Sequence, residues 1–320
     1  MIVLLLVLVF SVSSIAISIN RSQGFYSSWS DLLGSSRNFK SVAVSNKNLV
    51  KVDSKFLKSA KLIAKDLYLV KDVITGKESK VSNVVYLLLP TKAVDLLKAR
   101  GSLNSTDYQV AELLTGFPSQ PEMWIKSLKV EQEISTFNST HTKAIIGVIP
   151  QINIAGHYDL DCMNLANGKP DAETWLTKDM HTYVKTRLGL PPTRWMAMGV
   201  STGAWCAFMF SVNHPDLYLG AVSIAGYYRP ALPLTDPLAL QNAMKVKYDI
   251  ATMEAKLTSP VPIYMVASLG DKYSIRETTR FLAKPHPMLN IKYVEIATGG
   301  HNPNVWKSSI LPGLEWLSSY

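Results

Sequence analysis

Residues 195–214 read WMAMGVSTGAWCAFMFSVNH, and the pattern of this stretch decides the fold. The apolar run at 195–198 is typical of a buried strand, and the second half of the stretch is typical of a buried helix. Between them stands GVSTG at 199–203, a G-x-S-x-G motif. Its two glycines permit a cramped turn from strand to helix, which lifts the hydroxyl of Ser201 above the sheet. The pentapeptide alone is common, but its position between a strand and a helix favours Ser201 as a nucleophile.

On either side of this stretch, short β-rich runs alternate with helical segments from about residue 68 onward. Runs such as VVYLLL and AIIGVI are apolar throughout, as expected of strands that helices cover on both faces. We therefore predict an α/β domain with a mostly parallel, eight-stranded sheet and helices on both faces. The expected strands lie around 68–75, 83–90, 107–114, 143–150, 194–199, 219–225, 261–268 and 290–297.

A serine hydroxyl becomes a good nucleophile when a histidine takes its proton and an acid orients that histidine. In sheets that carry this turn, the acid and then the histidine follow the serine, on loops after later strands. Asp271 follows the expected strand at 261–268, and His301 follows the expected strand at 290–297. The sequence therefore predicts a catalytic triad of Ser201, Asp271 and His301.

Other residues compete for two of these roles. His286 lies between two prolines ahead of the last expected strand, where a histidine on the wrong edge of the sheet is the ordinary expectation. Asp249 and Glu254 are the alternative acids. Asp271 itself has a simpler interpretation, as a turn residue after Gly270. Its place after the seventh expected strand nevertheless favours it.

Acyl transfer also needs two backbone N–H groups that point at the oxyanion. One belongs to Thr202, directly after the nucleophile. We assign the other to Phe117, in the loop TGFP at 115–118 that follows the expected strand at 107–114. The simpler interpretation of this loop is an ordinary turn at the end of a strand. We expect no cofactor and no metal, because an activated serine supplies its own nucleophile and proton transfer.

Residues 1–20 form an uncharged apolar segment, close to the shortest helix that spans a bilayer. Two interpretations stay open: a retained transmembrane anchor, which we favour, and a cleaved signal segment with small residues at 16–18. Arg21 taken alone would favour the opposite orientation, with the domain inside. Residues 21–60 are interpreted as a juxtamembrane connector, and 61–320 as the catalytic domain.

The formal net charge of +9 comes from 33 Lys and Arg against 24 Asp and Glu, spread along the sequence. A nucleic-acid-binding protein would need a clustered basic stripe and a recognisable module, and neither is present. We therefore expect no nucleic acid partner. A mild positive charge suits a domain that lies close to anionic lipid head groups.

The two cysteines, Cys162 and Cys206, are too few for a disulfide scaffold and lack the second pair that a spaced zinc site needs. A single disulfide and two buried thiols stay open as alternatives. Cys206 follows Ser201 by about one and a half helical turns. A bridge to Cys162 would hold a loop beside the nucleophile.

Six segments stand in order along the chain: GFYSSWSDLLG (24–34), ELLTGFP (112–118), LDCMN (160–164), ETWLTKDM (173–180), the stretch 194–230 and GGHNPNVWKSSILPGLEWL (299–317). Together these segments resemble the putative-esterase branch of the α/β-hydrolases, which includes mycolyltransferase-like and esterase D-like proteins. Within it, the chain resembles membrane-anchored esterase-family proteins of actinobacteria, from about residue 20 to the C-terminus. The resemblance implies the α/β-hydrolase fold, the triad given above and an extracytoplasmic domain behind a membrane segment.

We therefore expect an extracytoplasmic serine esterase or acyltransferase at the membrane surface, acting through an acyl-enzyme on Ser201. The expected substrate is an acyl or aminoacyl ester of a cell-envelope lipid or glycolipid. Hydrolase and transferase stay open, because the outcome depends on whether water or an alcohol reaches the acyl-enzyme. The protein is expected in the cell membrane, or secreted if the N-terminal segment is cleaved. The alternative is a non-catalytic envelope binding or structural protein, against which the presence of all three triad residues argues.

Overall fold

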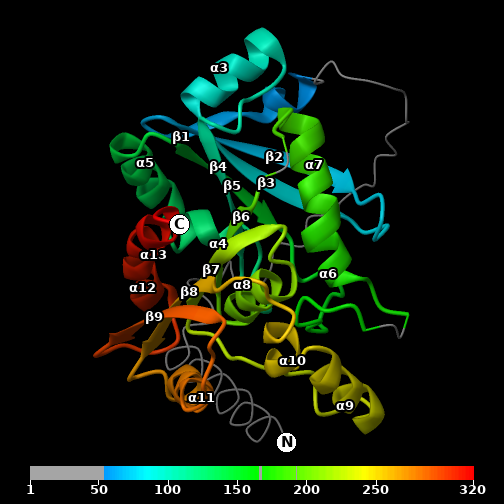
Figure 1. Cartoon of the computed structure of the whole chain (residues 1–320). Coiled ribbons are helices and arrows are strands. Elements are labelled where there is room, and N and C mark those ends of the chain that lie inside the picture. The colour runs from blue at the N-terminus through cyan, green and yellow to red at the C-terminus, as the bar shows by residue number, and fades with distance from the viewer. Residues whose placement is uncertain (1–53, 166–167, 192) are drawn as a thin grey trace, which may run out of the picture.

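The computed structural model describes residues 54–165, 168–191 and 193–320, which fold around one sheet (Figure 1). The sheet has nine strands in the order β1-β2-β3-β5-β4-β6-β7-β8-β9. Eight of them match the expected strands to within about a residue at each end. The strands are β1 (Lys61–Ala64), β2 (Leu67–Thr75), β3 (Ser82–Pro90), β4 (Tyr108–Leu114), β5 (Ala144–Pro150), β6 (Trp195–Val200), β7 (Tyr218–Ile224), β8 (Val261–Ser268) and β9 (Leu289–Ile296).

The prediction of eight strands was wrong by one, since β1 was not foreseen. This strand pairs antiparallel with β2 at the edge of the sheet, with a register shift between Leu62 and Ala64. Its four residues are exposed or half-buried. A short edge strand needs no apolar run, and an exposed lysine such as Lys61 is ordinary at such an edge. The sequence therefore carries no pattern from which β1 could have been predicted.

The direction of the strands changes across the sheet. The pairings from β1 through β2 and β3 to β5 are antiparallel. All pairings from β5 through β4, β6, β7 and β8 to β9 are parallel. The sheet is thus mostly parallel, as predicted. The parallel part places the carboxyl ends of β4, β6, β8 and β9 along one edge, which is where ligands bind in sheets of this kind.

Helices cover both faces of the sheet (Figure 1). Alternate residues of β3 join different core clusters: Val85, Leu87 and Leu89 pack in one, and Val84, Tyr86 and Leu88 in the other. The first cluster includes residues of α3 (Thr91–Arg100), α7 (Met180–Leu188), α8 (Thr202–Asn213), α9 (Leu238–Lys247), α10 (Ile250–Glu254) and α11 (Lys272–Leu282). The second includes residues of α4 (Met123–Lys126), α5 (Val130–Thr140), α12 (Pro303–Trp306) and α13 (Ile310–Ser318).

Four short helical segments complete the described elements. The segment α6 (Ala172–Thr174) continues through η2 (Trp175–Asp179), a π-helical turn, into α7, and η3 (Lys307–Ser309) joins α12 to α13. The 3₁₀ helix η1 (Ser54–Ser59) lies within the expected connector at 21–60. Its Phe56 and Leu57 are nevertheless buried in the core. Packing of the domain therefore begins before residue 61.

The expected N-terminal apolar helix, together with most of the connector, lies outside the described residues. Within the described parts of the chain, no helix combines the length and the apolar character needed to cross a membrane.

Candidate active site

Ser201 occupies a strained turn between β6 and α8. Its backbone has φ 56° and ψ −121°, a conformation that a residue with a side chain rarely adopts. The turn is tight because the flanking glycines lie against backbone. A Cβ at Gly199 would lie 1.9 Å from the carbonyl oxygen of Gly203, and a Cβ at Gly203 would lie 2.2 Å from that of Leu114. Glycine is therefore required at both positions of the motif.

The structure brings Ser201, His301 and Asp271 together from three loops of the sheet. The Oγ of Ser201 lies 2.9 Å from Nε2 of His301, and Nδ1 of the same ring lies 2.5 Å from Oδ2 of Asp271. His301 and Asp271 are 8% and 4% exposed, so water competes little for these hydrogen bonds. Trp306 meets the imidazole edge to face at 4.8 Å between ring centres. The ring is thus held between its acid, the serine and an indole.

Asp271 is fixed from two sides. Its side chain caps α11 by accepting a hydrogen bond from the backbone N–H of Ser274 at 3.2 Å. The hydroxyl of Ser268 donates to the carbonyl oxygen of Gly299 at 2.5 Å, which joins the loops that carry the acid and the histidine. Burial acts to raise the pKa of Asp271, but hydrogen bonds from His301 and Ser274 and the charge of His301 lower it overall. The carboxylate is therefore ionised and serves as an acceptor for the imidazole N–H.

The loop predicted to provide part of the oxyanion site lies against the nucleophile. A Cβ at Gly116 would lie 3.0 Å from Cβ and 3.5 Å from Oγ of Ser201. The side-chain amide of Asn153 donates to the carbonyl oxygen of Ser119 at 2.6 Å and so anchors the loop. Phe117 follows Gly116 directly and is half-buried. The loop therefore approaches Ser201 at Gly116, directly before the predicted donor Phe117.

Two neighbouring aspartates, the half-buried Asp159 and the buried Asp161, lie beside Ser201 and were not predicted as functional. Asp159 accepts hydrogen bonds from the hydroxyl of Thr202 at 3.1 Å and from the backbone N–H of Asp161 at 2.9 Å. Asp161 accepts from the Tyr227 hydroxyl and from the N–H of Ala231. The resemblance marked the LDCMN segment, but no sequence spacing connects it to Thr202 or Tyr227. The pair holds the residue that follows the nucleophile.

Burial is the main cause that raises the pKa of both aspartates. The pKa of Asp159 rises to about 6, although hydrogen bonds from Asp161 and Thr202 act in the opposite direction. The pKa of Asp161 rises to about 7, through burial and then through the charge of Asp159. The folded protein therefore binds protons here that the unfolded chain has already released. This contribution to stability is present below about pH 4 and is lost as the pH rises through about 6 and 7.

Asp159→Asn is expected to flatten the pH dependence of stability. The amide can still accept from Asp161 and donate to the Thr202 hydroxyl, while the repulsion between two carboxylates disappears. The free energy of unfolding of the wild type should fall more steeply than that of the variant as the pH rises from about 5 to about 8. Over this range, the difference between the two proteins should shift in favour of the variant by on the order of 2 kcal/mol. Urea unfolding across this range measures it. Asp95→Asn, an exposed change on α3 with the same charge difference, serves as control; equal slopes for both variants would contradict the prediction.

The structure joins Cys162 and Cys206 in a disulfide with 5.7 Å between the Cα atoms. Cys162 belongs to the segment that carries the aspartate pair, and Cys206 lies on α8, the helix that begins behind Ser201. Asp161 and Cys162 both have positive φ, at 49° and 57°. The bridge therefore holds a strained backbone segment against the helix of the nucleophile.

Cys162→Ala together with Cys206→Ala is expected to lower the free energy of unfolding by about 4 kcal/mol, because the bridge closes a loop across 44 residues. Urea unfolding under non-reducing conditions measures the loss. Addition of a reductant should bring the wild type to the stability of the double variant and leave the variant unchanged. A double variant as stable as the oxidised wild type would contradict this expectation.

The competing residues from the sequence lie elsewhere and have partners of their own. Nδ1 of His286 lies 2.9 Å from Oε2 of Glu254, and Nε2 lies 3.1 Å from the carbonyl oxygen of Phe281. Asp249 caps α10 through the N–H of Thr252. Within 54–165, 168–191 and 193–320, no three or more His, Cys, Asp or Glu residues are arranged to hold a metal ion. By contrast, Asp271 and His301 form a hydrogen-bonded series that ends at Ser201.

Solved structures of several esterases and hydrolases share this fold at low sequence identity. An S-formylglutathione hydrolase from Agrobacterium tumefaciens matches with a TM-score of 0.65 and 12% identity, covering 82% of this chain and 98% of the other. A ferulic acid esterase matches with a TM-score of 0.61 and 15% identity, over 79% and 98%. The fluorophosphonate-binding serine hydrolase F of Staphylococcus aureus matches with a TM-score of 0.59 and 13% identity, over 79% and 98%. At these identities the likeness shows the α/β-hydrolase fold.

Sequence comparison adds a curated relative and a family. An uncharacterized protein of Corynebacterium glutamicum is 21% identical over 228 residues, which span 67% of this chain and 53% of the relative. The chain thus matches about half the length of that protein. The model of the family described as putative esterase matches residues 102–317. This match includes the motif at Ser201, Asp271 and His301, so the chain belongs to the putative esterase family.

Proposed function

We propose that this protein is an extracytoplasmic serine esterase or acyltransferase that acts on an acyl or aminoacyl ester of a cell-envelope lipid or glycolipid. The observation that carries the catalytic part is the continuous hydrogen-bonded series from Ser201 Oγ through His301 to Asp271, at 2.9 and 2.5 Å. A serine in such a series is activated for attack on a carbonyl carbon. Membership of the esterase family supports the same reaction type.

On this geometry we propose a role for each side chain in the reaction. Nε2 of His301 takes the proton of Ser201 as Oγ attacks the ester carbonyl, and Asp271 stabilises the imidazolium that forms. The backbone N–H groups of Thr202 and Phe117 are proposed to donate to the oxyanion. His301 then gives its proton to the leaving alcohol, which departs and leaves an acyl group on Ser201. Water or a second alcohol, deprotonated by His301, attacks the acyl-enzyme and releases the product.

Features around the site support a lipid substrate. Leu269, between β8 and Asp271, is 50% exposed, and Tyr273 in the first turn of α11 is 41% exposed. In the segment between β7 and β8, Leu234 is 93% exposed and Leu238 is 67% exposed. Large apolar side chains at such exposure are suited to contact with acyl chains or a lipid surface. The net charge of +9 favours a surface with anionic head groups.

Labelling with a fluorophosphonate probe tests the proposed catalytic site. The wild type should form a covalent adduct, because the probe phosphonylates an activated serine. Ser201→Ala should form none, and Ser308→Ala, a change at an exposed serine, should label like the wild type. Absence of labelling in the wild type would instead favour a binding or structural protein that keeps the fold.

Incubation of the full chain with extracted envelope lipids tests the substrate class. Mass spectrometry should show that one ester species disappears or exchanges its acyl group with the wild type, and that it persists with Ser201→Ala. Free acid as the product identifies a hydrolase, and a new ester identifies a transferase. A wild type that labels with fluorophosphonate but changes no envelope ester would exclude the lipid substrate and leave the catalytic site intact.

A further inference from the structure

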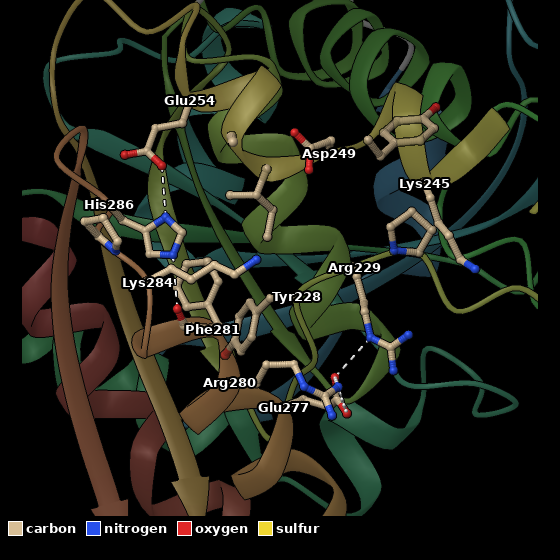
Figure 2. A pocket seen from close by; sticks show the side chains of 15 residues that line it. Tyr228, Arg229, Lys245, Asp249, Glu254, Glu277, Arg280, Phe281, Lys284 and His286 are labelled. Atoms are coloured by element: carbon tan, nitrogen blue, oxygen red, sulfur yellow. Dashed lines mark hydrogen bonds and ion pairs between the residues drawn. The ribbon is translucent and has the colours of Figure 1, made fainter. Parts of the chain in front are cut away.

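A pocket of about 430 Å³ lies apart from the triad, and neither Ser201, Asp271 nor His301 lines it. Its walls come from residues 228–230 after β7, from α9 and α10, and from α11 with the loop that follows it (Figure 2). Tyr228, Tyr248 and Phe281 contribute aromatic rings. A space of this size accommodates a small molecule or the head group of a larger one.

Four cationic side chains line this pocket: Arg229, Lys245, Arg280 and Lys284. Figure 2 shows them around the same space, each from a different position of the chain. Lys245 is exposed on α9, and Lys284 is exposed just after α11. Among the residues that the structure describes, neither lysine has a hydrogen-bonded or ionic partner for its amine. Two ammonium groups are thus available to a ligand.

The two arginines are oriented by one buried carboxylate. Glu277 accepts from Nε of Arg229 at 3.1 Å and from a terminal nitrogen of Arg280 at 3.0 Å. The Glu277 side chain is 2% exposed, whereas those of Arg229 and Arg280 are 49% and 56% exposed. Arg276 also contacts Glu277, at 3.3 Å. One carboxylate therefore faces three guanidinium groups, and the remaining N–H donors of the two lining arginines stay accessible.

The other carboxylates of the pocket are already engaged. Glu254 is buried and accepts from the backbone N–H of Met288 at 2.8 Å, in addition to its contact with His286. Asp249 accepts from the N–H and the hydroxyl of Thr252, both at 2.9 Å. Both bonds of Asp249 use Oδ2, and this residue is exposed, so its carboxylate still faces the pocket. A molecule that enters the pocket therefore meets four cationic side chains and aromatic rings, together with the carboxylate of Asp249.

We propose that this pocket is a binding site for a phosphate group, carried by a small molecule or by the head group of a lipid. Arg229 and Arg280 offer several N–H donors from planar groups of fixed orientation, a geometry that matches phosphate oxygens. Lys245 and Lys284 add the compact charges that phosphate also binds. The aromatic walls contact the organic part of the ligand. The site does not depend on the chemistry at Ser201, so binding and catalysis can be tested separately.

Calorimetric titration of the full chain in non-ionic detergent tests the proposal. Inorganic phosphate and glycerol phosphate are the soluble probes, with chloride at matched ionic strength as the reference, and Ser201→Ala prevents turnover. Lys245→Gln with Lys284→Gln should weaken binding of phosphate by at least about tenfold, because two charge-assisted contacts are lost. Lys92→Gln with Lys98→Gln, exposed on α3, makes the same change in net charge and should bind like the parent. Both pairs of lysines are exposed, so folding should be unaffected.

The source of the phosphate group is identified by competition in the same micelles. Displacement of bound phosphate by phosphatidylglycerol, but not by diacylglycerol, would support the site and identify a lipid head group. Displacement by glycerol phosphate but not by phosphatidylglycerol would support a soluble ligand. Equal binding of phosphate by the two double variants would overturn the proposal. So would the absence of binding by the parent at millimolar phosphate, whatever the outcome of fluorophosphonate labelling.

Discussion

His301→Gln is expected to lower kcat for a p-nitrophenyl ester by about 10⁴-fold or more. A glutamine can fill the space between Ser201 and Asp271 but cannot take the proton from Oγ, so the serine remains a neutral alcohol. Since only transition-state stabilisation is lost, KM should change far less than kcat. Fluorophosphonate labelling should slow in parallel, because it depends on the same activation.

The control for this experiment is His286→Gln. His286 was the one competing histidine in the sequence, and the structure pairs it with Glu254 in the wall of the phosphate pocket. At a temperature where both variants are folded, His286→Gln should keep kcat within about threefold of the wild type, because the ring touches no reacting atom. Loss of activity in this variant with retention in His301→Gln would show that the assignment of the base is wrong.

Gly203→Ala is expected to be a severely damaging substitution, with a loss of at least about 5 kcal/mol in the free energy of unfolding. The new methyl group would lie 2.2 Å from the carbonyl oxygen of Leu114 and 2.4 Å from that of Thr115. Neither backbone atom can retreat easily, because Leu114 pairs with Gly199 in the sheet. The helix behind the nucleophile must move away from β4, and Ser201 moves with it.

Gly156→Ala provides the matched control for that change. Gly156 has a φ of +66°, but no atom lies within 4 Å of a Cβ built there. Its replacement should cost only the backbone strain, roughly 1 kcal/mol. Urea midpoints for the two variants, or soluble yield and protease resistance where Gly203→Ala does not fold, measure the difference. Similar stability of both variants would mean that contact with β4 does not limit the turn.

The positions of the triad residues were predictable because each follows a strand whose apolar run is plain. Ser201 follows β6, Asp271 follows β8 and His301 follows β9, and the carboxyl ends of parallel strands share one edge of the sheet. The distances between their side chains were not predictable from this order. They depend on the turn at Ser201 and on the contact of the loop at Gly270 with Gly299, where a Cβ would lie 2.3 Å from a carbonyl oxygen.

Other parts of the structure carry no pattern in the sequence. The aspartate pair depends on Tyr227, which lies 66 residues beyond Asp161, so only the folded chain shows that their side chains meet. The cations of the phosphate pocket come from the loop after β7, from α9, from α11 and from the loop after α11, with no regular spacing. The pairing of the cysteines was left open by the sequence, since composition alone does not distinguish a bridge from two thiols.

The bridge between Cys162 and Cys206 also links the oxidation state of the two cysteines to the protonation of the two aspartates. The segment that it holds carries Asp159 and Asp161, whose pKa values are raised mainly because the fold removes water from around the carboxyl groups. When the bridge is open, this segment is freer to leave the helix, the carboxyl groups gain solvent and their pKa values fall toward ordinary ones. Preparations that differ only in the oxidation of these two sulfur atoms will therefore differ in how their stability depends on pH. The thiol content of a sample must be known before its pH profile is interpreted.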